Sequence, residues 1–177
     1  MGDPRKSRKL FHRPRRIWAT EQLNAELYIM GSYGLRNKRE LWRAQTEMAR
    51  IRNQARALLA LSAEARAEKE KRLLNYLLRI GLVKEGATLD DILGLKVEDL
   101  LERRLQTIVM KKGGTKSPYQ ARQVVSHGHV SIGNRKINIP GYIVKKDEEA
   151  QILLHIEIAA AAAPAGAPAT GEATPAS

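Results

Sequence analysis

The chain of 177 residues contains no cysteine. This absence excludes disulfide bonds, thiolate zinc sites, iron–sulfur clusters and a cysteine nucleophile. Aromatic residues are scarce, and no stretch approaches the roughly 18 apolar residues that a membrane-spanning helix requires. The first eighteen residues carry cations throughout and lack the apolar core of a signal peptide. We therefore expect a protein that stays soluble inside the cell and has no membrane partner.

Motifs of the common enzyme classes are also missing. The chain has no G-x-G-x-x-G or P-loop pattern, no H-E-x-x-H zinc motif and no G-x-S-x-G nucleophile motif. We predict no catalytic residues, no metal site, no cofactor and no small-molecule substrate.

Positive charge is abundant and unevenly distributed. The 31 lysines and arginines outnumber the 19 acidic residues, so the formal net charge is +12. Residues 1–16 hold seven basic residues and one acidic residue, and residues 101–147 hold ten and two, whereas residues 61–100 are nearly neutral. Two separated cationic blocks favour a polyanion that touches both, and nucleic acid fits this pattern better than an anionic membrane does.

The first part of the chain has the apolar spacing of helices. Helices are expected over five segments, 20–31, 38–60, 62–81, 88–94 and 97–109. Thr20, Ser62 and Thr88 are candidate N-caps, and Asn37 with Glu40 has the spacing of a capping box.

After residue 110 the pattern changes. Ser117 as cap and Pro118 in the first turn open a helix that Gly128 ends. Alternating apolar residues then predict strands at 130–132, 137–139, 142–144 and 152–158, with a hairpin turn at 133–134. We predict an α+β fold, in which a mainly helical N-terminal region precedes a small unit of helices packed on a short antiparallel β-sheet.

Residues 101–144 contain a set of motif residues in a characteristic order. They are Glu102, Arg104, Leu105, Ala121, Arg122, Val125, Gly128, His129 and Val130, followed by Gly133, Asn134 and Arg135 at the hairpin. With these residues the segment resembles the RNA-binding module named after ribosomal protein S4 of the small subunit. Residues 14–59 and the segments LLNYLLRIGLV and LDDILGLKVEDLLERRLQTIV extend the resemblance to the archaeal and eukaryotic type of the S4 family.

The resemblance implies a primary binder of 16S ribosomal RNA, at a helix junction of the 5′ domain, that nucleates assembly of the 30S body. It also implies ribosomal proteins five and twelve of the small subunit as neighbours, proximity to the channel that messenger RNA enters, and a contribution to translational accuracy. The expected location is the small ribosomal subunit in the cytoplasm. A ribosome-assembly factor with the same architecture, which processes ribosomal RNA, is the alternative, and an RNA-modifying enzyme that carries this module is less favoured.

Composition and resemblance together divide the chain into four segments. They are a basic extension over 1–16, a helical N-terminal domain over 17–96, an S4-type RNA-binding domain over 97–158, and a disordered tail rich in alanine, proline and glycine over 159–177.

The candidate RNA-binding residues are cationic and polar. They are Arg5, Arg8, Arg13, Arg15 and Arg16 in the extension; Arg39, Arg43 and Arg50 on one helix face; and Arg103, Arg104, Lys111, Lys112, Lys116, Ser117, Gln120, Arg122, Gln123, His127, His129, Asn134, Arg135 and Lys136 in the module. Arg122, near the capped helix start, is the strongest candidate for contact with a phosphate.

Several of these residues have an ordinary structural alternative. Arg103 has Asp99 four residues earlier as an ion-pair partner, Glu47 interrupts the arginine face, and the two histidines suit hydrogen bonds at a helix end. Trp18 and Trp42 are predicted to pack between helices, with stacking on RNA bases as the alternative.

Overall fold

A computed structural model describes residues 10–113 and 115–155. The helical part comprises α1 (Thr20–Ser32), α2 (Lys38–Leu59), α3 (Ala63–Ile80), α4 (Leu89–Gly94) and α5 (Val97–Glu102). The rest comprises α6 (Leu105–Lys111), α7 (Pro118–Ser126), β1 (Val130–Ile132), β2 (Arg135–Lys136), α8 (Lys146–Glu149) and β3 (Ile152–Leu154). The predicted α+β class is confirmed. The predicted disordered tail lies outside the described residues.

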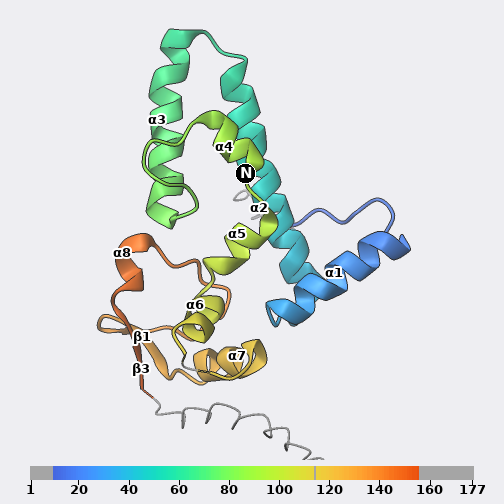
Figure 1. Ribbon diagram of the computed structural model, residues 1–177, viewed down its shortest axis with the longest axis vertical. Coiled ribbons are helices and arrows are strands. Elements are labelled where there is room, and N and C mark those ends of the chain that lie inside the picture. Colours follow the sequence, from blue (N-terminus) through green and yellow to red (C-terminus); the bar gives the residue numbers. More distant parts are fainter. Residues whose placement is uncertain (1–9, 114, 156–177) are drawn as a thin grey trace, which may run out of the picture.

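The molecule is elongated, with the long α2–α3 pair at one end and the small sheet at the other (Figure 1). Helices α5 and α6 lie between these ends, and α1 projects to one side of α2 (Figure 1). None of the described helices combines the length and the apolar character needed to cross a membrane.

Two hydrophobic cores divide at residues 103–104. The first core lies among α2, α3, α4 and α5, and its most deeply buried side chains include Leu41, Met48, Leu77, Ile92 and Leu101. The second lies among α6, α7 and the sheet, and includes Leu105, Val109, Val125, Val130 and Val144. Burial of these side chains is the main term that stabilises each half.

The predicted helix over 97–109 is wrong, because the chain breaks into α5 and α6. Arg104 has extended backbone angles, with φ −73° and ψ 141°. It forms an isolated bridge with Ile143, and the Leu105 amide donates to the Tyr142 carbonyl at 2.8 Å. Leu101 thus packs in the first core and Leu105 in the second, although both continue one helical spacing in the sequence.

The sheet differs from the expected strands. Its order is β2-β1-β3, and both pairings are antiparallel. A two-residue turn pairs Ile132 with Arg135, so the second strand of the hairpin is Arg135–Lys136 instead of 137–139. Residues 142–144 form no named strand beyond the bridge at Ile143, and the acidic turn after them is helix α8.

The helix starts show which cap predictions hold. The Ser117 hydroxyl accepts a hydrogen bond from the Gln120 amide at 3.2 Å, which confirms the strongest start signal. Asp91 accepts from the Thr88 amide at 2.8 Å. Asn37 and Ser62 precede their helices without capping side-chain bonds, and Ala19 occupies the cap position expected for Thr20.

Candidate nucleic-acid interface

The hairpin presents cations outward from a buried strand. All three residues of β1 are buried, whereas both residues of β2, Arg135 and Lys136, are exposed. Asn134 in the connecting turn is also exposed. Neither Arg135 nor Lys136 forms an ion pair with a carboxylate of the described residues. An edge strand with two unpaired cations offers a rigid support for phosphate contacts.

Some polar side chains at α7 cap the start of the helix, and others are exposed to solvent. The side chains of Ser117 and Gln120 cap the helix start, where the Gln120 Oε1 accepts from the Lys116 amide at 2.9 Å. Gln123 and the Lys116 side chain are exposed. The cap therefore fixes the backbone beside Lys116 while the Lys116 ammonium stays in solvent.

Two histidines follow the end of α7. The rings of His127 and His129 have centroids 6.4 Å apart, and Gly128 between them has a φ of +77°. His127 is exposed and His129 is half-buried. The left-handed glycine reverses the chain, so His127 ends α7 and His129 directly precedes β1.

The two lysines at the end of α6 are exposed but partly engaged. The Lys111 ammonium lies 3.1 Å from a Glu102 carboxylate oxygen, and Lys112 donates to the backbone carbonyl of Glu149. These are contacts of surface side chains in solvent, where one ion pair contributes little free energy. Both ammonium groups therefore stay available to a second anion.

Arg104 and Arg122 converge on one carboxylate of α2. Arg122 donates to both oxygens of Glu40, at 2.8 and 3.2 Å, and Arg104 donates to one of them at 3.0 Å. Arg104 is only 8% exposed. Burial raises the pKa of Glu40, but the hydrogen bonds from Arg122 and Arg104 outweigh it and leave the pKa below its ordinary value. Glu40 therefore joins the helical half to the module as a carboxylate.

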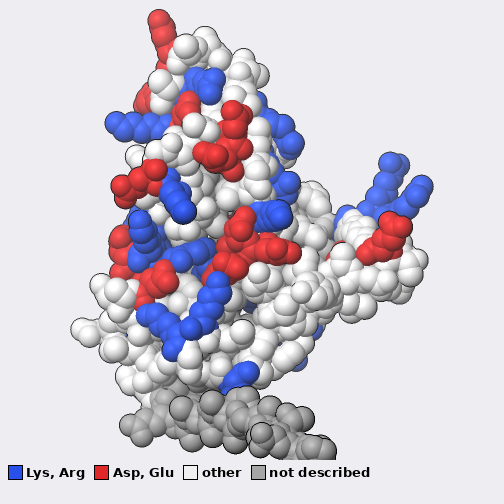
Figure 2. Space-filling model, viewed as in Figure 1, with Lys and Arg blue, Asp and Glu red and all other residues white. Residues whose placement is uncertain are grey.

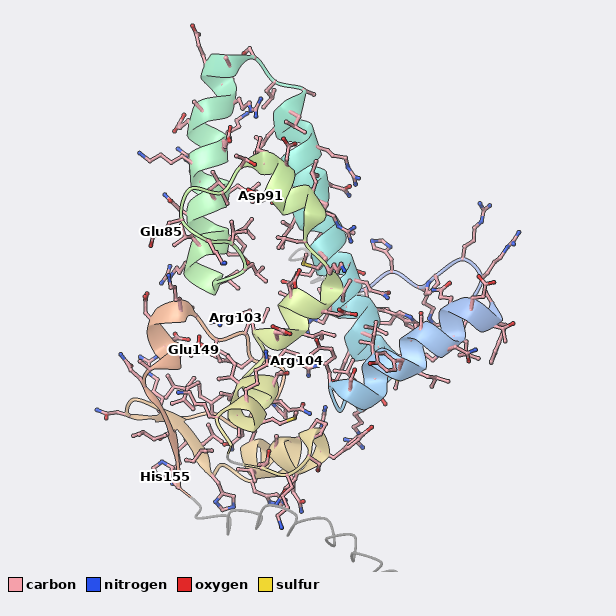
Figure 3. The ribbon with its side chains drawn as sticks, in the orientation of Figure 1. Glu85, Asp91, Arg103, Arg104, Glu149 and His155 are labelled. Atoms are coloured by element: carbon pink, nitrogen blue, oxygen red, sulfur yellow. The ribbon has the colours of Figure 1, made fainter. Side chains whose placement is uncertain are left out.

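Arg103, which lies beside Arg104 at the break between α5 and α6, bonds to α3, α8 and Val144. Its guanidinium donates to the Ile80 carbonyl at 2.8 Å, to Glu149 at 2.8 Å and to the Val144 carbonyl at 3.2 Å. Figure 3 shows Arg103 and Arg104 at the junction of α5 and α6, with Glu149 on α8. The ion-pair partner of Arg103 is thus Glu149, and the alternative partner Asp99 is not used.

A cavity of about 270 Å³ lies where α2 meets the module. Arg43, Arg104 and Arg122 line it together with Glu40 and Glu47. The structure thus brings together three of the predicted residues from separate parts of the sequence. Two of the three are already paired with Glu40, and Arg43 is exposed.

The arginine face of α2 is only partly free. Arg39, Arg43 and Arg50 are all exposed, and none forms an ion pair with a described carboxylate. The Arg39 guanidinium lies 5.9 Å from the centre of the Phe11 ring, in a cation–π arrangement. Glu47 is not their ion-pair partner among the described residues.

The basic extension is described from residue 10 onward, so Arg5 and Arg8 lie outside the described residues. Arg13, Arg15 and Arg16 are exposed. They precede α1, and long cationic side chains stand out at the outer end of that helix, with acidic side chains beside them on the helix (Figure 2). This segment is a second cationic region, separate in the chain from the hairpin.

Three polar residues that position the site were missed. Glu40 was assigned to a capping box, Glu26 was not singled out, and neither was Gln106. The Gln106 amide donates to the carbonyls of Tyr33, Gly34 and Pro118, and is 1% exposed. No sequence signal links these partners, which lie up to 82 positions apart.

Both halves of the chain match known protein families. Residues 103–149 match the family described as "S4 domain", and residues 5–102 match the one described as "Ribosomal protein S4/S9 N-terminal domain". Over 149 residues the chain is 58% identical to "Small ribosomal subunit protein uS4" of Ignicoccus hospitalis, covering 84% of this chain and 90% of that protein.

Proteins of the same name from two other organisms are comparably similar. The one from Nitrosopumilus maritimus is 57% identical over 152 residues, with 86% of this chain and 76% of that protein covered. The one from Metallosphaera sedula is 56% identical over 153 residues, with 86% and 85% covered.

Proposed function

This chain belongs to the ribosomal protein S4 family, uS4 of the small subunit, and we propose that it is a structural component of that subunit which binds ribosomal RNA and catalyses no reaction. It acts in the cytoplasmic ribosome. The relatives compared above carry the name of a subunit protein, which favours this function over an assembly factor and over an RNA-modifying enzyme.

The observation that carries the proposal on the structural side is the pair of exposed cations on β2, which form no ion pair with residues 10–113 or 115–155. Arg135 and Lys136 stand on a strand whose partner is fully buried, so their backbone position is fixed before RNA arrives. Recognition of folded RNA depends largely on shape and on phosphate contacts, which require cations on a rigid support. Lys112, Lys116 and Gln123 are further exposed polar residues of the module.

The finer assignment follows from the family resemblance. The RNA is 16S ribosomal RNA, the contact is a helix junction in its 5′ domain, and binding nucleates assembly of the 30S body. Ribosomal proteins five and twelve are the proposed neighbours, and together with them the chain contributes to translational accuracy. The exposed arginines of α2 and of residues 13–16 support an RNA surface that continues from the module onto the helical half.

Arg103, Arg104 and Arg122 have a different place in this proposal. Their guanidiniums are bonded to carboxylates and carbonyls of the protein. We assign them mainly to holding the two halves in one geometry. Arg122 and Arg43 also line the cavity between α2 and the module, where they can contact a phosphate of the RNA.

A binding titration tests the proposal. The full chain is titrated with the transcribed 5′ domain of small-subunit ribosomal RNA and with a scrambled RNA of equal length, at several salt concentrations. We expect a preference of about 100-fold for the native fragment at physiological salt. Equal affinity for both RNAs, with both lost as salt rises, would show generic polyanion binding and overturn the proposal.

A further inference from the structure

The two tryptophans of the chain have opposite environments. Trp42 on α2 is 9% exposed; its indole N–H donates to Glu26 at 3.1 Å, and its ring stacks on Phe11 with centroids 6.0 Å apart. Trp18, in the turn before α1, is 84% exposed. The prediction that both pack between helices is confirmed for Trp42 and wrong for Trp18.

The segment that carries Trp18 is anchored on both sides. On one side, the His12 amide donates to the Thr46 hydroxyl at 3.0 Å, and Phe11 lies against Trp42. On the other side, the Leu23 amide donates to the Ala19 carbonyl at 2.9 Å and begins the hydrogen bonding of α1. Between these anchors the chain runs outward to the far end of α1, and the helix then leads back toward α2 (Figure 1).

Helix α1 is itself fixed on α2 by a buried carboxylate. Glu26 is 4% exposed, accepts from the Trp42 indole, and lies 3.0 Å from the Lys38 ammonium. Burial raises the pKa of Glu26, but its hydrogen bonds with Trp42, Lys38 and Gln22 outweigh this and lower the pKa. The segment that carries Trp18 is therefore held in place by contacts within the protein. Less conformational entropy is lost when this segment binds a partner.

The charge around Trp18 selects the kind of partner. Arg13, Arg15 and Arg16 are exposed within five residues of it, and no acidic residue occurs between residues 10 and 20. An indole ring supplies a flat apolar face for stacking, and guanidiniums supply phosphate contacts on either side of the stacked base. A protein partner would have to match three cations in this short span, whereas a nucleic-acid strand carries a phosphate at every nucleotide.

We propose that Trp18 is a base-stacking site for an unpaired nucleotide of RNA, with Arg13, Arg15 and Arg16 holding the phosphates that flank it. This inference rests on the proposed function, because it assigns a specific contact to the same RNA-binding protein. It places an aromatic contact about one helix length away from the module, at the far end of α1.

Tryptophan fluorescence tests the proposal directly, because stacking on a base quenches indole emission. Trp42 is the only tryptophan that remains in the Trp18→Phe variant. The emission of Trp18 is therefore the difference between the emission of the unsubstituted protein and that of this variant. We expect a single-stranded RNA of about twelve nucleotides to quench the Trp18 emission and a blunt duplex of equal length to leave it unchanged. The Trp42 emission should stay constant with both probes.

Affinity measurements with variants complete the test. Trp18→Ala should lower affinity for the single strand and for the 5′ domain about tenfold, and Trp18→Phe should lower it less, because phenylalanine retains a smaller ring. Tyr76→Ala is the matched control, since Tyr76 is an exposed aromatic residue on α3 outside the cationic segments. It should bind as the unsubstituted protein does. Thermal unfolding of Trp18→Ala should be unchanged, because the indole is not packed.

The failures of the two proposals are distinguishable. If Trp18→Ala binds normally and Trp18 remains quenchable by acrylamide in the RNA complex, the stacking site is overturned, and a protein partner becomes the occupant to seek. If the stacking site fails in this way but the double variant Arg135→Glu and Lys136→Glu still has lower affinity for the 5′ domain, the proposed function stands. Loss of the preference for the 5′ domain, with quenching by single strands intact, would overturn the proposed function alone.

Discussion

Arg122 on α7 and Glu40 on α2, 82 positions apart in the chain, form a two-bond ion pair with distances of 2.8 and 3.2 Å. Arg104 shares the same carboxylate, and Gln106 ties the turn after α1 to the start of α7. The orientation of the module on the helical half is therefore set by polar contacts beside two separate hydrophobic cores. Paired groups of this kind favour a single geometry more than they add stability.

Removal of the shared carboxylate should destabilise the protein. Glu40→Gln leaves the nearly buried Arg104 without a counter-charge, and we expect a loss of about 2 kcal/mol or more in the free energy of unfolding. Urea unfolding measures it. Glu70→Gln is the control, because Glu70 pairs with Arg66 on the surface of α3 and should lose less than about 0.5 kcal/mol. Equal losses in the two variants would show that Glu40 joins the halves only weakly.

Stability should also fall in acid through the same group. The folded-state pKa of Glu40 lies below its ordinary value of 4.5, so its contribution is complete above that pH and is lost as the pH falls through the lower, folded-state pKa. We expect the free energy of unfolding to decrease from about pH 5 downward. The decrease should be smaller in Glu40→Gln. A slope that is unchanged in the variant would mean that other carboxylates, such as Glu26, account for it.

Two glycines of one region should respond oppositely to alanine. Gly34 has a φ of +59°, and a Cβ there would lie 2.8 Å from both the Gln106 Nε2 and the Pro118 Cβ. Gly34→Ala should cost about 2 kcal/mol through strain and through displacement of that contact. Gly31→Ala in α1 meets no atom within 4 Å and should stabilise by about 0.5–1 kcal/mol. Thermal unfolding of both variants checks the pair, and similar midpoints would contradict the close approach.

Two serines that precede helices should also differ. The Ser117 hydroxyl caps α7, so Ser117→Ala should lose about 1 kcal/mol. Ser62 precedes α3 without a capping side-chain bond, and Ser62→Ala should change stability by only a few tenths of a kcal/mol. Chemical denaturation separates these values. The reverse order would place the hydroxyl contribution at α3.

Charge reversal on β2 should weaken RNA binding without unfolding the protein. Arg135→Glu with Lys136→Glu acts on two exposed side chains, and we expect a large loss of affinity for the 5′ domain. The slope of log K against log salt should fall by roughly one per lost phosphate contact. Arg66→Glu is the control with intact affinity, because Arg66 lies on α3 beside Glu70.

Arg122→Glu should behave differently from that double variant. It places two carboxylates together at the junction of the halves, so unfolding stability and RNA affinity should fall together. Circular dichroism at increasing temperature measures the first loss. A variant with normal stability and weak RNA binding would instead return Arg122 to direct contact with a phosphate.

Local sequence signals predicted the elements that local chemistry determines. Gly81 ends α3 in the left-handed conformation, and Ser117 starts α7, both as expected from residues a few positions away. The break at Arg104 was not predictable in this way. Apolar residues keep a helical spacing through it, and only the bridge from Arg104 to Ile143, 39 positions later, shows that the chain is extended there.

The candidate site was predictable in composition but not in its internal pairing. The cations of β2 and of the segment before α1 are exposed, as an RNA surface requires. The sequence does not reveal that Glu40 faces Arg104 and Arg122 instead of its own helix start. These arginines lie 64 and 82 positions after Glu40 in the chain, and no local rule relates residues at such separations. The burial of Trp42 and the exposure of Trp18 likewise depend on where the segment before α1 lies in the folded protein.

The division of the two cores has a consequence for the nascent chain. All the buried residues of the first core are present once Leu101 has emerged, and only the partly buried Ile143 joins them later, whereas the second core requires residues as far as Ile152. Contacts that are close in sequence form early, and domains fold in order from the N-terminus. The helical half thus assembles on the translating ribosome while Glu40 is still hydrated, and its orientation to the module is fixed only when Arg104 and Arg122 have emerged.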